Sequence, residues 1–118
     1  SDVGKINNYA VVEGQLYGGI AQGIGFALKE DFEDVEKQNN LIACGFPYIR
    51  DIPDDICLIH METPREFGTF GASGTGEIPH PAPHAAIINA MHDACGIRLK
   101  TIPATPDKVL KALEVAKK

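Results

Sequence analysis

The strongest constraint on the fold is a stretch of glycine and proline past the middle of the chain, residues 67–83, which reads FGTFGASGTGEIPHPAP. Its glycines let the backbone turn sharply and let a ligand approach closely. Its prolines fit before a helix or in a first helical turn, but not inside a helix. Regular structure must therefore stop at this stretch and begin again after it.

Glu77 is the isolated charge of this stretch. Between Phe67 and His92 it is the only side chain with a full formal charge at neutral pH. A carboxylate among small and apolar neighbours is expected to be partly shielded from water, which suits it to proton transfer. The alternative is a solvated glutamate on an ordinary glycine-rich surface turn.

A helix is predicted over residues 14–32, because Leu16, Ile20, Ile24 and Leu28 recur at four-residue steps. The segment is unusually rich in glycine, and each glycine costs about 1 kcal/mol of helix propensity against alanine. So many glycines in one helix are easier to explain if another group must pack closely against it. Tight packing against another backbone and contact with a cofactor both remain open.

The other elements predict an α+β fold, a single small domain over residues 1–118 with short strands and two further helices. Residues 56–61 and 97–102 have strand character, and residues 41–49 are expected to be extended. A helix over residues 84–95 should stop at Gly96, and a last helix should open with Thr105 as cap and Pro106 at its first position. The acidic residues 29–37 are expected to be a solvated helix end and loop.

Composition excludes several classes of function. The net charge of -5 argues against nucleic acid, which is bound by basic surfaces. No apolar run approaches the roughly 20 residues needed to cross a bilayer. The three cysteines form no Cys-x-x-Cys pair, so cysteine ligation of zinc or iron–sulfur clusters has no support. We expect a cytoplasmic protein with reduced thiols and with no membrane partner.

Two other constellations are weaker. His80 and His84 have the four-residue spacing of a zinc-binding pair, but the intervening prolines make surface or capping histidines the alternative. Ser73 lacks the Gly-x-Ser-x-Gly context of a nucleophile elbow.

Three blocks of the sequence resemble one known family. The block FGASGTGEIP, residues 70–79, resembles the segment that carries the active-site glutamate of the molybdenum hydroxylases, the xanthine oxidase and aldehyde oxidoreductase family. The blocks VEGQLYGGIAQGIGFAL, residues 12–28, and LKTIPATPDKV, residues 99–109, also match, in family order. Residues 64–74 look most similar to bacterial aldehyde oxidoreductases. The resemblance therefore spans nearly the whole chain.

The resemblance implies that the chain is a fragment of a larger molybdopterin-binding domain, its C-terminal part. That family inserts water-derived oxygen into a C–H bond of an aldehyde or an electron-poor aromatic ring. Carried over by position, Glu77 matches the general base and Gln15 matches a glutamine that hydrogen-bonds the pterin. The loop of Ser73, Gly74 and Thr75 matches one that lies against the cofactor. Gln22 falls in the same block as Gln15.

The same resemblance implies the cofactors and partners. Molybdopterin, in its cytosine dinucleotide form, would hold molybdenum in the complete enzyme, so no metal ligand from this chain is expected. Iron–sulfur clusters and FAD would lie on other domains or subunits, and the remaining molybdopterin-binding segments would be partners. Apolar surface bared by truncation would favour self-association of the fragment. The alternative is a non-catalytic structural or interaction module that completes a partner subunit's site. The small-molecule substrate, whether aldehyde, purine or another heterocycle, stays open.

Overall fold

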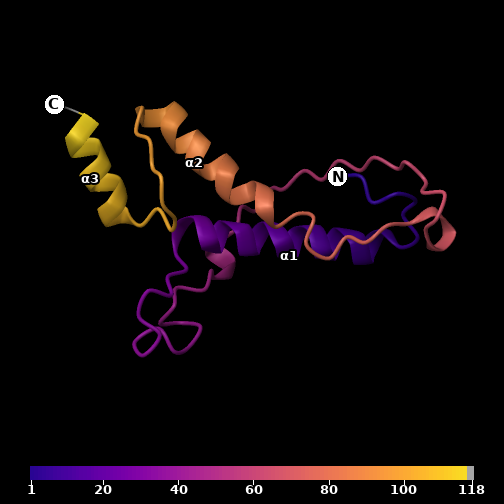
Figure 1. Ribbon diagram of the computed structural model, residues 1–118, viewed down its shortest axis with the longest axis horizontal. Coiled ribbons are helices and arrows are strands. Elements are labelled where there is room, and N and C mark those ends of the chain that lie inside the picture. Colours follow the sequence, from indigo (N-terminus) through magenta and orange to yellow (C-terminus); the bar gives the residue numbers. More distant parts are fainter. Residues whose placement is uncertain (117–118) are drawn as a thin grey trace.

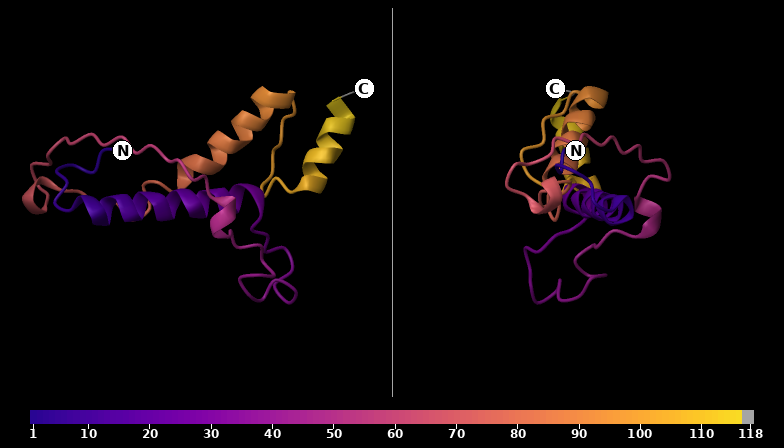
Figure 2. Two further views of the ribbon diagram at one scale, coloured as in Figure 1. Left: turned by 180° about the vertical axis from the view of Figure 1, so that it is seen from behind. Right: turned by 90° about the vertical axis from the view of Figure 1, so that its right-hand side faces the viewer.

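The computed structural model describes residues 1–116, which contain three α-helices and two short 3-10 turns (Figure 1). In chain order these are α1 (Tyr9–Leu28), η1 (Ile49–Asp51), η2 (Thr69–Gly71), α2 (Pro81–Cys95) and α3 (Pro106–Ala116). Helix α2 leaves the middle of α1 and leans toward its C-terminal end, with α3 beyond it (Figures 1 and 2). The extended segments before α2 run beside the first half of α1.

Helix α1 begins five residues earlier than predicted and ends four residues earlier. Asn8 caps its start, because the side-chain Oδ1 accepts the backbone N–H of Val11 at 3.2 Å. At the other end, the N–H groups of Lys29 and Glu30 both donate to the carbonyl of Gly25, so the chain turns back on itself. This helix start could have been recognised from the sequence, because asparagine is a preferred N-cap residue.

Close packing with α2 explains two glycines of α1. A Cβ at Gly19 would overlap the side chain of Pro79, and one at Gly23 would lie 2.9 Å from Pro83 and 3.0 Å from the carbonyl oxygen of His80. At Gly18, by contrast, no atom of the described residues lies within 4 Å of that position. The absence of a side chain at Gly19 and Gly23 therefore lets the start of α2 pack close to the backbone of α1.

The α+β class is not confirmed, because strand structure in residues 1–116 is limited to two isolated bridges. Met61 bridges Asp2 in parallel and Ala72 bridges Gly4 in antiparallel fashion. Residues 56–61, predicted as a strand, form only the isolated bridge at Met61 with this short N-terminal segment. Residues 97–102 form no strand, and residues 41–49 contain turns. A stable β-sheet needs several paired strands, and a single short neighbouring segment is not enough to form one.

The ends of the other helices follow the predictions more closely. Helix α2 includes Pro81 and Pro83 in its first turn and therefore begins three residues before the predicted start. Gly96 ends it in the left-handed conformation, with φ of 72°, and donates its N–H to the carbonyl of His92 at 2.7 Å. Helix α3 begins at Pro106, as predicted.

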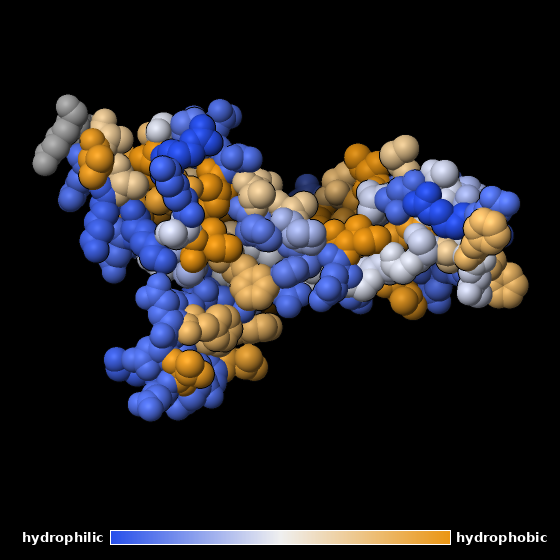
Figure 3. Space-filling model, in the orientation of Figure 1, coloured by the Kyte–Doolittle hydropathy of each residue, from blue (hydrophilic) through white to orange (hydrophobic). Residues whose placement is uncertain are grey.

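The buried core is small for a chain of this length. Its cluster comprises Val3, Ile6, Val12 and Leu16, with Leu58 packed against it. The radius of gyration is 17.4 Å, whereas a compact chain of this length would have about 13.5 Å. Hydrophobic side chains reach the surface at several places (Figure 3). The most exposed are Phe67, Ile49, Phe70 and Ile42. Much apolar surface is thus left uncovered by residues 1–116.

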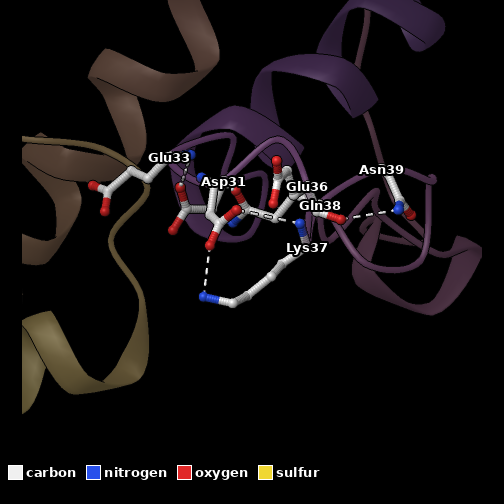
Figure 4. A network of polar contacts seen from close by, with 7 residues as sticks. Asp31, Glu33, Glu36, Lys37, Gln38 and Asn39 are labelled. Atoms are coloured by element: carbon white, nitrogen blue, oxygen red, sulfur yellow. Dashed lines mark hydrogen bonds and ion pairs between the residues drawn. The ribbon is translucent and has the colours of Figure 1, made fainter.

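The acidic stretch after α1 forms a turn held by its own side chains (Figure 4). Lys37 Nζ lies 2.6 Å from Asp34 Oδ2, and these contacts hold the pKa of Asp34 below its usual range. Asp31 accepts the N–H of Glu33 at 3.0 Å. Glu33 and Glu36 are exposed, as predicted for a solvated loop. Among the helices of residues 1–116, none has both the length and the apolar character that a membrane crossing requires.

Candidate functional site

The glycine-rich loop before α2 lies against α1, and one hydrogen bond joins two of the predicted site segments. Gln15, on the first half of α1, donates its side-chain Nε2 to the carbonyl of Gly76 at 2.6 Å. The N–H of His80 donates to the carbonyl of Glu77 at 3.2 Å, which forms the turn into α2. Gln15 and Glu77 are therefore neighbours in space, although they come from distant parts of the sequence.

The N-terminal segment holds the other side of the loop. Ser73 donates its N–H to the carbonyl of Val3 at 2.8 Å, and Lys5 donates its N–H to the carbonyl of Gly71 at 2.8 Å. The extended segment before the loop is tied to the same residues, because Met61 donates its N–H to the carbonyl of Ser1 at 2.8 Å. The loop is thus held between the N-terminal segment and α1.

The loop presents its predicted cofactor-facing residues outward. Ser73, Gly74 and Glu77 are exposed, and Thr75 is half-buried. At Gly74 and Gly76 no atom of the described residues lies within 4 Å of a Cβ position, so a flat ligand could lie against the backbone there. Thr75 Oγ1 is buried and has no hydrogen-bond partner within residues 1–116. Open glycines and an unpartnered hydroxyl fit a loop that contacts a bound cofactor.

Glu77 itself is exposed, so the shielding predicted from its neighbours is not provided by residues 1–116. Small and apolar residues next to a carboxylate in the sequence do not by themselves cover it in the folded chain. Next to it, Ile78 lines an apolar hollow of about 410 Å³ together with Leu16, Ile20 and Leu58. Any shielding of the carboxylate must come from groups beyond these residues.

Gln22 is not brought to this loop. It lies two turns further along α1 and lines a separate hollow of about 480 Å³ with Phe46, Tyr48 and Ile52. The two glutamines of the block therefore differ in position: Gln15 contacts the loop that carries Glu77, whereas Gln22 faces the segment around η1.

One buried acidic residue was missed by the sequence analysis. Glu30 was assigned to the solvated acidic stretch, but only 7% of it is exposed. The turn onto the Gly25 carbonyl carries it back against α1, where its Oε1 is closely packed on Gly25. Burial raises the pKa of this carboxyl, and His80 opposes the shift. Gly25 could have indicated this packing from the sequence, because a residue without a side chain leaves room for a neighbouring group.

The two histidines at the start of α2 are half-buried. The rings of His80 and His84 have centroids 6.2 Å apart, and the ring of His80 packs edge-on against Phe26 at 5.0 Å. Within residues 1–116, no group of three or more His, Cys, Asp or Glu side chains is arranged to hold a metal ion. The zinc interpretation of the pair therefore gains no support from the geometry.

Comparisons with known proteins identify the segment. A family model for a molybdopterin cofactor-binding domain matches residues 1–53. The chain is 52% identical to an aldehyde oxidoreductase of Megalodesulfovibrio gigas over 97% of its own length and 13% of the relative's length.

Two crystal structures have the same fold over this length. The aldehyde oxidoreductase of Desulfovibrio desulfuricans superposes with a TM-score of 0.90 at 57% identity, covering 94% of this chain and 12% of that one. Quinoline 2-oxidoreductase of Pseudomonas putida 86 gives 0.83 at 32% identity, covering 96% and 15%.

Sequence and fold together define a segment of a molybdopterin-binding region. The chain belongs to the molybdenum hydroxylase family. It spans about an eighth of the length of the aldehyde oxidoreductases that it matches. The family resemblance is thereby confirmed, while the roles of the individual site residues stay predictions.

Proposed function

We propose that this segment supplies the general base and part of the pterin contacts of a molybdenum hydroxylase. The observation that carries the proposal is the 2.6 Å hydrogen bond from Gln15 to the Gly76 carbonyl, which joins groups 61 residues apart. It sets the residue matched to a pterin contact beside Glu77, the residue matched to the base. The similarity to aldehyde oxidoreductases supports the reaction class.

Each group of the loop has a part in the proposed reaction. Molybdopterin with molybdenum, when bound, supplies the redox chemistry that accepts electrons from the substrate C–H bond. A carboxylate oxygen of Glu77 takes the proton from the water-derived oxygen that is inserted into that bond. The Gln15 side chain and the Ser73–Thr75 loop orient the pterin, with the open positions at Gly74 and Gly76 allowing close approach. The rest of the enzyme covers Glu77 and excludes water.

The finer assignments extend this proposal to the complete protein. Residues 1–118 form the C-terminal part of the molybdopterin-binding domain, and the cofactor carries the cytosine dinucleotide. Iron–sulfur clusters and FAD lie on other domains or subunits, and the protein works in the cytoplasm. An aldehyde is the favoured substrate, because the most similar relatives reported above are aldehyde oxidoreductases.

A second candidate function is a non-catalytic module that completes a partner subunit's site. The exposed apolar side chains favour it, because residues such as Phe67, Ile49 and Phe70 are more than three-quarters exposed and are suited to contact with another surface. Molybdenum and pterin analysis of the chain purified with its neighbouring segments separates the two. Stoichiometric cofactor with Glu77-dependent turnover supports the catalytic role, whereas cofactor with turnover independent of Glu77 supports the module.

The isolated 118-residue chain is expected to bind no molybdenum and to show no activity with aldehydes or purines. The reason is that the proposed cofactor loop is open and exposed, with most contacts supplied by the other segments. Elemental analysis, pterin fluorescence after oxidation and a turnover assay on the purified chain test this. Light scattering on the same sample should show self-association through the uncovered apolar surface. Stoichiometric molybdopterin recovered with the chain alone would refute the expectation.

Replacing Gln15 with alanine in the complete protein should lower the pterin content and reduce turnover mildly. The change removes the hydrogen bond to the Gly76 carbonyl and loosens the loop against α1. Gln22→Ala is the matched control, because Gln22 lies on the same helix but lines the other hollow. Equal pterin loss in both variants would show that the contact with Gly76 has no special role.

A further inference from the structure

Two carboxylates tie the N-terminal segment to the extended segment that precedes the glycine-rich loop. Asp2 Oδ1 accepts the backbone N–H of Thr63 at 3.2 Å, across 61 residues of sequence. Glu62 Oε2 accepts the backbone N–H of Ile6 at 2.9 Å, across 56 residues. The contacts are reciprocal, because each segment supplies one carboxylate and one backbone N–H group.

Each carboxylate makes a second hydrogen bond that fixes its own position. Asp2 Oδ1 also accepts the N–H of Gly4 at 3.0 Å and lies 3.6 Å from the Nη2 atom of Arg65. Glu62 Oε1 accepts the hydroxyl of Tyr9 in the first turn of α1. The two contacts together join the N-terminal segment, the start of α1 and the segment before the loop.

Both carboxyls accept these bonds as ionised groups at neutral pH. Hydrogen bonds from Thr63 contribute most to holding the pKa of Asp2 below its usual range. The hydroxyl of Tyr9 contributes most to holding the pKa of Glu62 below its usual range. An ionised oxygen accepts a stronger hydrogen bond than a neutral one, so these are favourable contacts for backbone N–H groups.

The stretch between the two contacts is the part of the N-terminal segment that holds the loop. Val3 accepts the N–H of Ser73 at 2.8 Å, and Lys5 donates its N–H to the carbonyl of Gly71 at 2.8 Å. A Cβ at Gly4 would lie 2.5 Å from the carbonyl oxygen of Gly71. The two backbones are therefore in direct contact, and a shift of one must move the other.

We propose that Asp2 and Glu62 form a reciprocal clamp, which fixes residues 2–6 against residues 60–65 and thereby positions the loop of Ser73, Gly74 and Thr75. The hydrogen bonds of both carboxylates within residues 1–116 go to residues outside that loop. Both are therefore positioning residues, which act through the N-terminal segment. Their effect on cofactor content and turnover rests on the proposed function of the loop.

The clamp is expected to control local opening of the loop rather than the stability of the whole protein. The side chain of Asp2 is 31% exposed and Glu62 is exposed, so their bonds can open without disturbing the core. Amide hydrogen exchange reports such local opening, because an amide exchanges only while its hydrogen bond is broken.

The test is amide hydrogen exchange of the complete protein, measured by mass spectrometry on peptides from the loop and from α2. Replacing Asp2 or Glu62 with alanine removes both hydrogen bonds of that carboxylate. We expect exchange in residues 71–76 to become about 2–10-fold faster, the ratio that corresponds to losing a typical hydrogen bond. Exchange in residues 85–95 should stay unchanged. Asp2→Asn and Glu62→Gln keep an acceptor oxygen and should restore most of the protection.

Asp31→Ala is the matched control. Asp31 Oδ1 accepts the N–H of Glu33 at 3.0 Å, the same spacing and distance as between Asp2 and Gly4, but in the acidic turn after α1. This variant should leave exchange in the loop unchanged.

Two results would overturn the clamp. One is unchanged exchange of the loop in both alanine variants, and the other is faster exchange in the loop and in α2 alike, which would indicate a loss of stability throughout. The exchange measurement does not depend on Glu77 being the base. Faster loop exchange together with turnover that survives Glu77→Gln keeps the clamp and rejects the proposed function. Unchanged loop exchange together with turnover that collapses in Glu77→Gln does the reverse.

Discussion

Replacing Glu77 with glutamine in the complete protein should lower turnover by about 10²–10⁴-fold, the usual effect of losing a general base. Glutamine keeps the size of the side chain and much of its hydrogen-bonding shape but cannot take the proton. Molybdenum and pterin contents should stay near normal, because the proposed pterin contacts come from the loop backbone and Gln15 rather than from Glu77. Steady-state turnover and metal analysis on one preparation measure both effects.

The matched control is Glu36→Gln, which neutralises an exposed glutamate of the acidic turn (Figure 4) and should leave turnover unchanged. If Glu77→Gln kept more than about a tenth of the original turnover, the loss would be smaller than a general base allows. Glu77 would then be an ordinary residue of a glycine-rich turn. Loss of cofactor in this variant would instead place the carboxylate among the pterin contacts.

Leucine at Gly19 or Gly23 should destabilise the protein by about 1–3 kcal/mol, the usual cost of overpacking a tight contact. The backbone of α1 lies so close to Pro79 and Pro83 that even a Cβ has no room. Because Pro79 precedes α2 and Pro83 lies in its first turn, the change should also displace the turn after Glu77. Thermal melting of the chain and of the complete protein measures the effect.

Gly18→Leu is the matched control, one residue from Gly19 but facing open space within residues 1–116. In the chain alone it should be neutral or slightly stabilising, because leucine has the higher helix propensity by somewhat under 1 kcal/mol. Unchanged melting temperatures for Gly19→Leu in both the chain and the complete protein would count against the close contact. Destabilisation by Gly18→Leu in the complete protein alone would reveal a neighbour on that face.

The sequence predicted the helices well because their signals are local. Gly96 and Pro106 bound α2 and α3 at the expected residues, and the four-residue repeat located most of α1. The predicted strands at residues 56–61 and 97–102 failed because a strand depends on partners elsewhere in the chain. In this segment those partners amount to one short stretch at the N-terminus.

The prediction of the candidate site named residues but could not describe their surroundings. The resemblance assigned Gln15 to the pterin and Glu77 to proton transfer, and the hydrogen bond from Gln15 to the Gly76 carbonyl brings the two segments together. Whether a carboxylate is covered depends on three-dimensional neighbours. Glu77, expected to be shielded, is exposed, while Glu30, expected to be solvated, is buried by a backbone turn onto Gly25. Neither outcome can be read from adjacent residues.

The ties between the N-terminal segment and the loop have a consequence for how the segment folds. The bonds from Ser73 to Val3 and from Gln15 to Gly76 each join groups more than 60 residues apart. Closing such long loops costs more chain entropy than forming a helix turn, so α1 should form on a faster timescale than these contacts. The Glu77 loop is therefore expected to become ordered late, after the helix that supports it already exists.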